Sequence, residues 1–315
     1  MIAGMQFGII LTTGDARQCS EMAAEAEAAG WDAVFTYEVL AIGADDHDRY
    51  DPWITLTAMA MTTSRIRLGA MVFAPSRRRP WKLAREAITL DGLSGGRLVL
   101  PVGMGTLDDA GFANVGEPVD ARVRGELLTE TLEILDGLSS GEPFAYAGDH
   151  YRFGPMTFRP RPVQRPRVPI WVVGAWPHVK SMRRAARWDG VVVQGTDAAG
   201  NPSNAPENLS EIVGWLQAER LRSGLDGAFD VVVGGVTPFG SADADASAAA
   251  VLAPLAAAGA TWWAEGDWSD VSLDALRARI AAGPPRVRSG AAGTAGAAGA
   301  AGAAGAVGDA GGGAG

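Results

Sequence analysis

The chain has 315 residues, of which 47% are hydrophobic and 20% charged, a balance typical of a soluble globular protein with a large core. Its formal net charge of −9 argues against a nucleic-acid-binding protein, which would need a basic face. The single cysteine, Cys19, excludes a disulfide framework and fits a reducing compartment. The N-terminus reads as a first strand and not as a signal peptide, and no apolar run is long enough to span a bilayer. We therefore expect a cytoplasmic protein with no membrane partner.

Short β-rich runs recur along the chain, and most of them are continuously apolar, as is typical of strands buried on both faces of a parallel sheet. We expect strands at 5–11, 32–37, 66–73, 97–103, 169–174, 189–194, 230–236 and 260–264. Helical patterns lie between them, with start and stop signals at 16–29, 80–91, 121–138 and 271–282. Strands and helices that alternate eight times predict an α/β fold, a (β/α)8 TIM barrel with small insertions; a doubly wound parallel sheet is the alternative.

Three segments depart from this alternation. Residues 38–52 follow the second strand and would lie on the catalytic rim of a barrel. Within 141–168, the sequence FAYAGDHYRF predicts a hairpin that turns at Gly148-Asp149. From 289 to 315 nearly every residue is Ala or Gly, and such a tract buries too little to offset its ordering entropy. We therefore divide the chain into a barrel of residues 1–288 and a disordered tail of residues 289–315.

Several short motifs point to chemistry that their context does not support. The G-x-S-x-G sequences at 92–96 and 137–141 both follow helical patterns, so they indicate helix C-terminal turns and not the nucleophile elbow of a hydrolase. The run DDHD at 45–48 is interpreted as a solvated loop, because the side chains of four consecutive residues diverge, and no metal is expected. Lys82 and Lys180 are the only lysines, which argues against an aldolase that would use a Schiff-base lysine.

Small or flexible residues gather where predicted strands end, at 72–74, 103–105 and 174–175. In a barrel these ends all face one mouth, where they would form an apolar slot with backbone donors. Such a slot suits an aromatic ring system with a phosphorylated tail, and the helix after 174–177 would present its N-terminal amides to the phosphate. The arginines at 77–79 are interpreted in two ways, as a solvated loop or as a site for an anionic ligand.

Long segments of the chain resemble the luciferase-like monooxygenase family. They are RIRLGAMVFAPSRRRPWKLAREAITLDGLSGGRLVLPVGMG, GEPFAYAGDHYRF, RPRPVQRPRVPIWVVGAWP, RRAARWDGVV and GATWWAEGDW. The resemblance runs from about Met5 to Arg288. It implies a (β/α)8 barrel that binds FMN or the deazaflavin coenzyme F420 at its C-terminal mouth. It also implies an oxidoreductase or monooxygenase that acts on a small organic substrate, often as a homodimer.

The resemblance also implies positions for the cofactor. Its ring would lie against the end of the third strand, which in this family often has a bulge with a non-proline cis peptide. The residues expected to contact ring, chain or phosphate are Met71, Val72, Phe73, Gly103, Met104, Gly105, Val173, Gly174, Ala175, Trp176 and His178. At Gly174 the chain would pass closest to the phosphate, so a larger side chain there is expected to clash with the ligand and not with the core.

Two positions depart from the family pattern. Many relatives have Asp-His after the second strand, where this chain has Tyr37-Glu38. That histidine is often assigned proton transfer in deazaflavin-dependent members, so Glu38 is a candidate general acid and Tyr37 a candidate substrate contact. The alternatives are that Glu38 fixes a loop on the rim, or that the protein is a non-catalytic flavin-binding relative. Pro101 replaces a common glycine and lacks an amide donor, which calls the pairing of the fourth strand into question.

Overall fold

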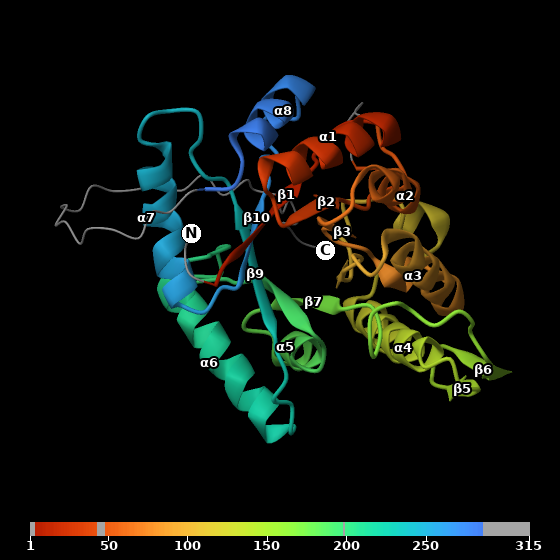
Figure 1. The fold of residues 1–315 in the computed structure, drawn as a ribbon. Coiled ribbons are helices and arrows are strands. Elements are labelled where there is room, and N and C mark those ends of the chain that lie inside the picture. The colour runs from red at the N-terminus through yellow and green to blue at the C-terminus, as the bar shows by residue number, and fades with distance from the viewer. Residues whose placement is uncertain (1–3, 43–47, 198, 286–315) are drawn as a thin grey trace.

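The computed structural model describes residues 4–42, 48–197 and 199–285, and its centre is a sheet of eight parallel strands that curls into a barrel (Figure 1). The strands lie in the order β3-β2-β1-β10-β9-β8-β7-β4. Their bounds are β1 (Gln6–Ile10), β2 (Ala33–Thr36), β3 (Arg67–Ala70), β4 (Leu100–Val102), β7 (Ile170–Ala175), β8 (Gly190–Gln194), β9 (Asp230–Gly235) and β10 (Trp262–Glu265). Parallel bridges from Leu68 to Leu98 and from Phe73 to Val102 connect β3 with β4. The predicted (β/α)8 barrel is confirmed.

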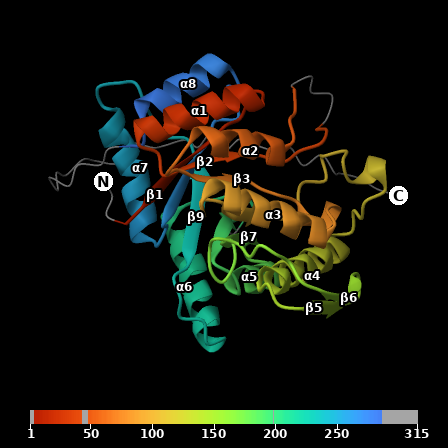
Figure 2. The same cartoon turned by 45° about the vertical axis from the view of Figure 1, so that its right-hand side comes forward.

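Helices cover the outside of the strands (Figures 1 and 2). Within the described residues they are α1 (Ala16–Ala29), α2 (Pro52–Thr62), α3 (Pro80–Ser94), α4 (Ala121–Ser139), α5 (Val179–Ala186), α6 (Pro206–Arg222), α7 (Ala244–Ala257) and α8 (Leu273–Ala282). Helix α1 has the predicted bounds, because Asp15 and Gln18 form a capping box at its start and Gly30, with a φ of 91°, ends it. The predicted tail and residues 45–47 of the predicted solvated loop lie outside the described residues.

Both G-x-S-x-G sequences end helices, as predicted. Helix α3 ends at Ser94 before Gly95, which has a φ of 68°, and α4 ends at Ser139. Each serine hydroxyl donates to a carbonyl of its own helix, Ser94 to Asp91 at 3.2 Å and Ser139 to Leu135 at 2.7 Å. Neither serine is therefore placed as a nucleophile.

The predicted hairpin is confirmed as β5 (Phe144–Ala147) and β6 (Arg152–Met156), which pair antiparallel. Its turn is held by Glu130 of α4, whose carboxylate accepts hydrogen bonds from the amides of Asp149, His150 and Tyr151 at 2.7, 3.1 and 2.9 Å. The hairpin lies beside α4 at the edge of the molecule in both ribbon views (Figures 1 and 2). It therefore lies apart from the sheet that forms the barrel.

Aromatic side chains pack together inside the barrel. Trp171 of β7 lies between Phe35 and Trp262, with ring centroids 6.0 and 5.1 Å away. Asp230, the first residue of β9, accepts hydrogen bonds from the indole nitrogens of Trp171 and Trp262 at 3.0 and 3.1 Å. Burial raises the pKa of Asp230, and these bonds only partly oppose the shift. In (β/α)8 barrels ligands bind at the C-terminal mouth, away from these strand starts.

A carboxylate of α1 fixes the turn that leads into β3. Glu27 accepts hydrogen bonds from the amides of Ser64, Arg65 and Ile66 at 2.9, 2.6 and 2.9 Å. Burial alone would raise the pKa of Glu27, but these bonds outweigh it and lower the pKa to about 2. A depressed pKa means that the charged group stabilises the fold fully above its ordinary value of 4.5, and that this stabilisation is lost as the pH falls through about 2.

We therefore expect Glu27→Gln to lower the free energy of unfolding at pH 7. The gap between the variant and the wild type should shrink as the pH falls from 4.5 toward 2, as urea unfolding at each pH would measure. Glu21→Gln, at a side chain that is 54% exposed, is the control and should change little. A gap for Glu27→Gln that stays constant with pH would contradict this account.

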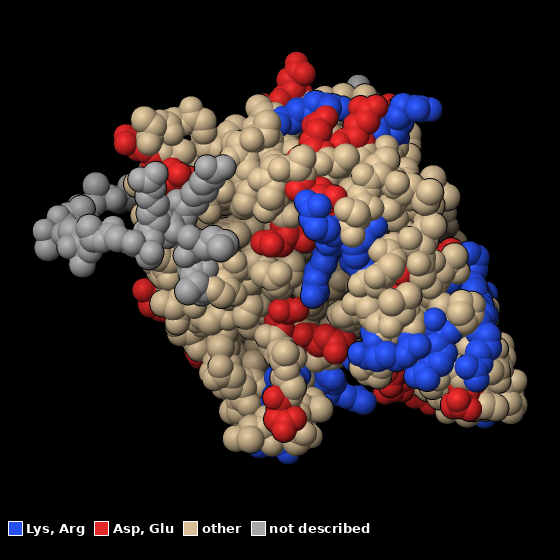
Figure 3. All heavy atoms as spheres, in the orientation of Figure 1, with Lys and Arg blue, Asp and Glu red and all other residues tan. Residues whose placement is uncertain are grey.

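Charges on the face in Figure 3 are interspersed over a mainly uncharged surface, with one group of Lys and Arg over the region of α4 and the hairpin. Among the described residues, no helix is both long and apolar enough to cross a membrane.

Candidate active site at the barrel mouth

The junction of β3 and β4 contains an extra residue. The bridges from Leu68 to Leu98 and from Phe73 to Val102 enclose five residue steps on the β3 side and four on the β4 side, which defines a bulge. The peptide bond from Met71 to Val72, inside this bulge, is cis. The bulge and the non-proline cis peptide that the family resemblance implied are thus both present.

Pro101 does not disturb the pairing of β4. Its carbonyl accepts a hydrogen bond from the Phe73 amide at 2.9 Å, and the Gly103 amide donates to the Phe73 carbonyl at 2.9 Å. On the other side Pro101 is in register with Trp171 of β7. Pro101 lacks an amide N–H at the place where β3 bulges away, so no hydrogen bond of the sheet is lost there. The expectation that Pro101 weakens the pairing of β4 is thus corrected.

Val72, Gly103 and Val173 meet at the C-terminal ends of three neighbouring strands. A Cβ added at Gly103 would lie 2.9 Å from Val173 Cγ2 and 3.2 Å from Val72 Cγ2, so both valine side chains cover this glycine. Met71 packs against the aromatic cluster inside the barrel. These four residues form an apolar floor, and we use the term barrel floor for them below.

Three other predicted cofactor positions face away from the mouth. Phe73 is fully buried and stacks on Trp53 of α2 at a centroid distance of 4.8 Å. Gly174 faces the helices, because an added Cβ would lie 2.6 Å from Val191 Cγ2 and 2.9 Å from a sulfur of α5. Trp176 packs against Trp215 of α6 at 6.1 Å. Side chains alternate along a strand, so β7 turns Val173 to the interior and its neighbour Gly174 outward.

Only some of the remaining residues predicted to contact the cofactor have groups available for a ligand. The Ala175 amide already donates to the Ser181 hydroxyl at 3.0 Å. His178 is exposed at the start of α5 and its side chain makes no capping bond. Met104 lies half-buried and Gly105 exposed beyond β4, where Gly105 has a φ of 76°. The first amides of α5 are therefore available to a phosphate, whereas the amide of Ala175 is already used.

The expectation that a larger residue at Gly174 spares the fold is wrong, and we now expect the reverse. The added methyls of Gly174→Val would overlap Val191 and Met182, which overpacks the layer between sheet and helix and costs about 1–3 kcal/mol or more of stability. Thermal unfolding should show a lower melting temperature. Gly154→Val, at a glycine with nothing within 4 Å of the added Cβ, is the matched control. Equal melting temperatures for the two variants would contradict this placement.

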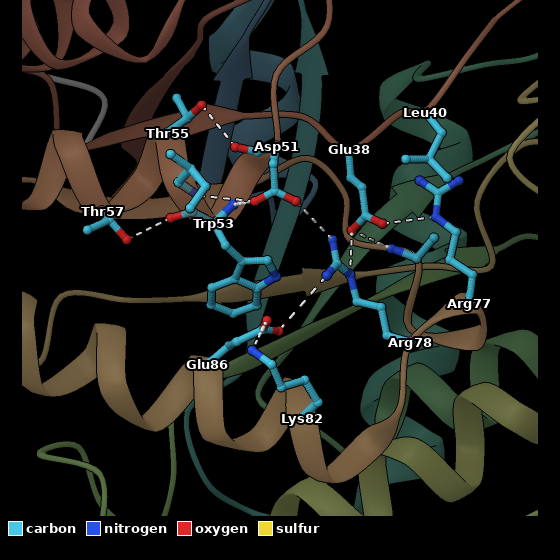
Figure 4. Close-up of polar contacts among 12 residues, drawn as sticks. Glu38, Leu40, Asp51, Trp53, Thr55, Thr57, Arg77, Arg78, Lys82 and Glu86 are labelled. Atoms are coloured by element: carbon cyan, nitrogen blue, oxygen red, sulfur yellow. Dashed lines mark hydrogen bonds and ion pairs between the residues drawn. The ribbon is translucent and has the colours of Figure 1, made fainter.

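Glu38 lies in a buried ion-pair network and not in an open position at the mouth (Figure 4). Its side chain is 3% exposed, and Arg77, itself 5% exposed, donates from Nε to Glu38 Oε1 at 2.9 Å. The other oxygen, Oε2, accepts from Arg78 Nε and from the amide of Ala74, both at 3.3 Å. Both carboxylate oxygens thus have donors, and the predicted alternatives for Arg77, a solvated loop or an anion site, are corrected to an internal ion pair.

Asp109 extends this network to a third loop. Its carboxylate accepts from Arg77 Nη1 and from the amides of Leu40, Ala41 and Gly111 at 3.1, 2.9 and 2.9 Å. Burial alone would raise the pKa of Asp109, but the Arg77 bond and these amides outweigh it and lower the pKa. The loops after β2, β3 and β4 are therefore connected through one arginine, and we call Glu38, Arg77 and Asp109 the rim clamp. This geometry favours the interpretation of Glu38 as a loop-fixing residue.

Two arginines beside Met104 were not among the predicted site residues. Arg124 of α4 is buried and donates from Nη2 to the carbonyls of Met104 and Gly105, while its Nε has no hydrogen-bond partner among the described residues. Arg184 of α5 donates to Thr129 at 2.9 Å. Burial lowers the pKa of both arginines, and within the described ranges neither has a carboxylate within ion-pair distance.

These two cations lie close together at the C-terminal end of β4. A Cβ added at Gly125 would lie 2.9 Å from Arg184 Nη2 and 3.8 Å from Met104 Sδ, which places Arg184 next to Met104. Sequence alone had no signal for Arg124, because an arginine near the start of an amphipathic helix is usually a surface residue. The mouth thus combines an apolar floor with two positive charges that lack an acidic partner in the described structure.

Comparison with known proteins identifies the family of this chain. Residues 2–306 match the family model of the luciferase-like monooxygenases. The chain belongs to the luciferase-like monooxygenase family. The predicted family is therefore confirmed, and the bulged β3 and the barrel floor described above lie within the matched residues.

Relatives of this luciferase-like protein include uncharacterized proteins and a named monooxygenase. An uncharacterized protein of Mycobacterium tuberculosis is 36% identical over 200 residues, which are 61% of this chain and 64% of that protein. A flavin-dependent trigonelline monooxygenase, oxygenase component, of Acinetobacter baylyi is 29% identical over 128 residues, 41% of this chain and 35% of that protein. The chain therefore matches less than two thirds of the length of these relatives.

Among solved structures, the coenzyme F420-dependent tetrahydromethanopterin reductase of Methanopyrus kandleri has a TM-score of 0.71 with 17% identity. The superposition covers 89% of this luciferase-like chain and 99% of the reductase. Because the identity is low, this likeness shows the shared barrel fold and no more.

Proposed function

We propose that this protein is an oxidoreductase that binds coenzyme F420 or FMN at the barrel mouth and acts on a small organic substrate. The observation that carries the proposal is the pairing of the apolar barrel floor with Arg124 and Arg184. The ring of either cofactor is flat and largely apolar, and its tail carries a phosphate. An apolar surface beside two arginines that have no acidic partner in the described structure suits both parts of such a molecule.

The chain's own residues would bind and orient the cofactor. The barrel floor would support the ring, and Gly103 leaves room for Val72 and Val173 to close over the strand ends. Arg124 and Arg184, with the first amides of α5, would hold the phosphate. The rim clamp would keep the three surrounding loops in place, which orients the ring and excludes water. When bound, the deazaflavin supplies hydride transfer and reduced FMN supplies oxygen activation.

A second candidate function is a flavin-binding protein without catalysis. It is favoured by the position of Glu38, whose two carboxylate oxygens are both occupied by arginines or a backbone amide. Turnover of a substrate with reduced cofactor would exclude it. The predicted homodimer and the cytoplasmic location stay predictions.

Titration of the purified full-length protein, separately with FMN and with coenzyme F420, tests the proposal. We expect at least one of them to bind with a clear shift in visible absorbance, because transfer from water to an apolar floor changes the environment of the ring. Of the two cofactors we favour the deazaflavin, because the GAWP turn and the PRPVQ connector resemble actinobacterial relatives, many of which use it. If a folded protein binds neither cofactor, the proposal is wrong.

A further inference from the structure

Exposed apolar side chains concentrate at the mouth of the barrel. Of the fifteen large hydrophobic residues that are exposed in the described structure, eight lie in loops that follow the C-terminal ends of strands. They are Leu40, Tyr50, Leu107, Val115, Val119, Val236, Phe239 and Trp268. These residues belong to the loops after β2, β4, β9 and β10, which surround the mouth.

Trp268 is the largest of these side chains, and it has an ordered aromatic partner. It is 54% exposed in the loop after β10, where the Asp267 carboxylate holds the turn by accepting from the Ser269 amide at 2.8 Å. Its ring meets the ring of Tyr37, at the end of β2, with centroids 5.1 Å apart and planes at 80°. Arg49 lies over the Tyr37 ring, 5.9 Å from its centroid. We call Tyr37 and Trp268 the aromatic wall.

The strand order places Trp268 across the mouth from Gly103, with Tyr37 between them beside β3. In the ring of eight strands, β10 lies four places from β4 in either direction, so Trp268 and Gly103 follow opposite strands. Tyr37 follows β2, which together with β10 flanks β1. If the cofactor is bound on the barrel floor, a substrate that enters the mouth would therefore contact Tyr37 and Trp268.

We propose that the aromatic wall is the substrate-binding surface and that it selects a flat, aromatic substrate. Aromatic rings in offset or edge-to-face contact gain attraction beyond that of their buried area, and a saturated, puckered molecule of the same size forgoes it. The exposed Trp268 ring has this contact to offer, while Tyr37 and the Asp267 turn fix its position. The inference rests on the proposed function in one respect, namely that the bound aromatic molecule is the substrate of the oxidoreductase.

The test compares two probes with the same carbon skeleton and the same hydroxyl group, 2-naphthol and decahydro-2-naphthol. Calorimetric titration of the full-length protein should give a dissociation constant for 2-naphthol that is about tenfold lower, the size expected for one or two aromatic contacts. Trp268→Ala should abolish this preference, while Trp268→Phe should keep most of it. Since Trp268 is exposed, both variants should fold.

Leu221→Ala is the matched control. Leu221 is 79% exposed and lines a cavity of about 320 Å³ between α6 and β9, away from the mouth, where an apolar probe could also bind. The preference should survive this substitution. Equal affinity of the wild type for both probes, a preference that survives Trp268→Ala, or one that Leu221→Ala removes would each overturn the inference.

The outcome is separable from that of the proposed function, because the probes are titrated without a cofactor. Binding of neither FMN nor coenzyme F420, together with a Trp268-dependent preference for 2-naphthol, would refute the proposed function and leave the aromatic site standing. Cofactor binding without that preference would refute the aromatic wall alone.

Discussion

Replacing Glu38 by alanine is expected to destabilise the protein by about 3–5 kcal/mol, because it leaves Arg77 as a buried cation with one of its two carboxylates removed. Arg77 is 5% exposed and Glu38 3%, so water cannot substitute for the lost partner. For a domain of this size such a loss corresponds to a fall of roughly 6–10 °C in melting temperature. Thermal and urea unfolding would measure it.

Glu86→Ala is the matched control for this experiment. Glu86 belongs to the same polar group (Figure 4), with Lys82 at 2.6 Å and Arg78 at 3.9 Å, but its side chain is 22% exposed. A pair that water can reach contributes at most about 1 kcal/mol. Equal destabilisation by the two substitutions would show that the rim clamp has no special role.

Glu38→Gln distinguishes loop fixing from proton transfer. If Glu38 fixes loops, this variant should lose stability and cofactor affinity together, because the charge that holds Arg77 is gone. A variant that folds and binds cofactor normally, yet turns over about 10² more slowly, would instead restore Glu38 as the proton-transfer group.

Arg124→Ala is expected to weaken cofactor binding by about 10- to 100-fold, the range for a lost hydrogen bond to a charged group in a buried site. The substitution removes a buried positive charge beside the proposed phosphate site, together with the hydrogen bonds to the Met104 and Gly105 carbonyls. Absorbance titration would measure the dissociation constant. The affinity of the variant should also depend less on salt than that of the wild type.

Arg122→Ala provides the control two residues away on the same helix. Arg122 is 70% exposed and forms an i,i+4 pair with Glu126 at 2.7 Å. Its removal should leave cofactor affinity unchanged, since exposed pairs of this kind contribute little. An Arg124→Ala protein that binds the cofactor as tightly as Arg122→Ala would place the phosphate elsewhere.

Much of the architecture could be predicted because its determinants are local. Helix α1 has the predicted bounds since its capping residues, Asp15 and Gly30, directly flank the helix in the sequence. The strands were recognisable from continuous apolar runs, and the hairpin from the turn at Gly148-Asp149 between β-prone segments. The long matching segments indicated the family, which the match over residues 2–306 then showed.

Positions within the site were harder to predict, since a strand alternates its faces and a shift of one residue reverses every side chain. The sequence identified the end of β7 but not that Val173 faces the interior while Gly174 faces α5. For the same reason Phe73 was expected at the cofactor, whereas it lies against Trp53. The phase of a buried parallel strand has no alternation in hydrophobicity to reveal it.

The sequence by itself determined the order of strands and helices, the turns that end them and the family, because these depend on residues close together in the chain. Only the tertiary structure decided which charges and rings meet. Arg77 and Asp109 are 32 residues apart, and Tyr37 meets Trp268 from the other end of the chain. Such pairs depend on how the barrel brings its loops to one edge, and no local pattern in the sequence records which loop lies beside which.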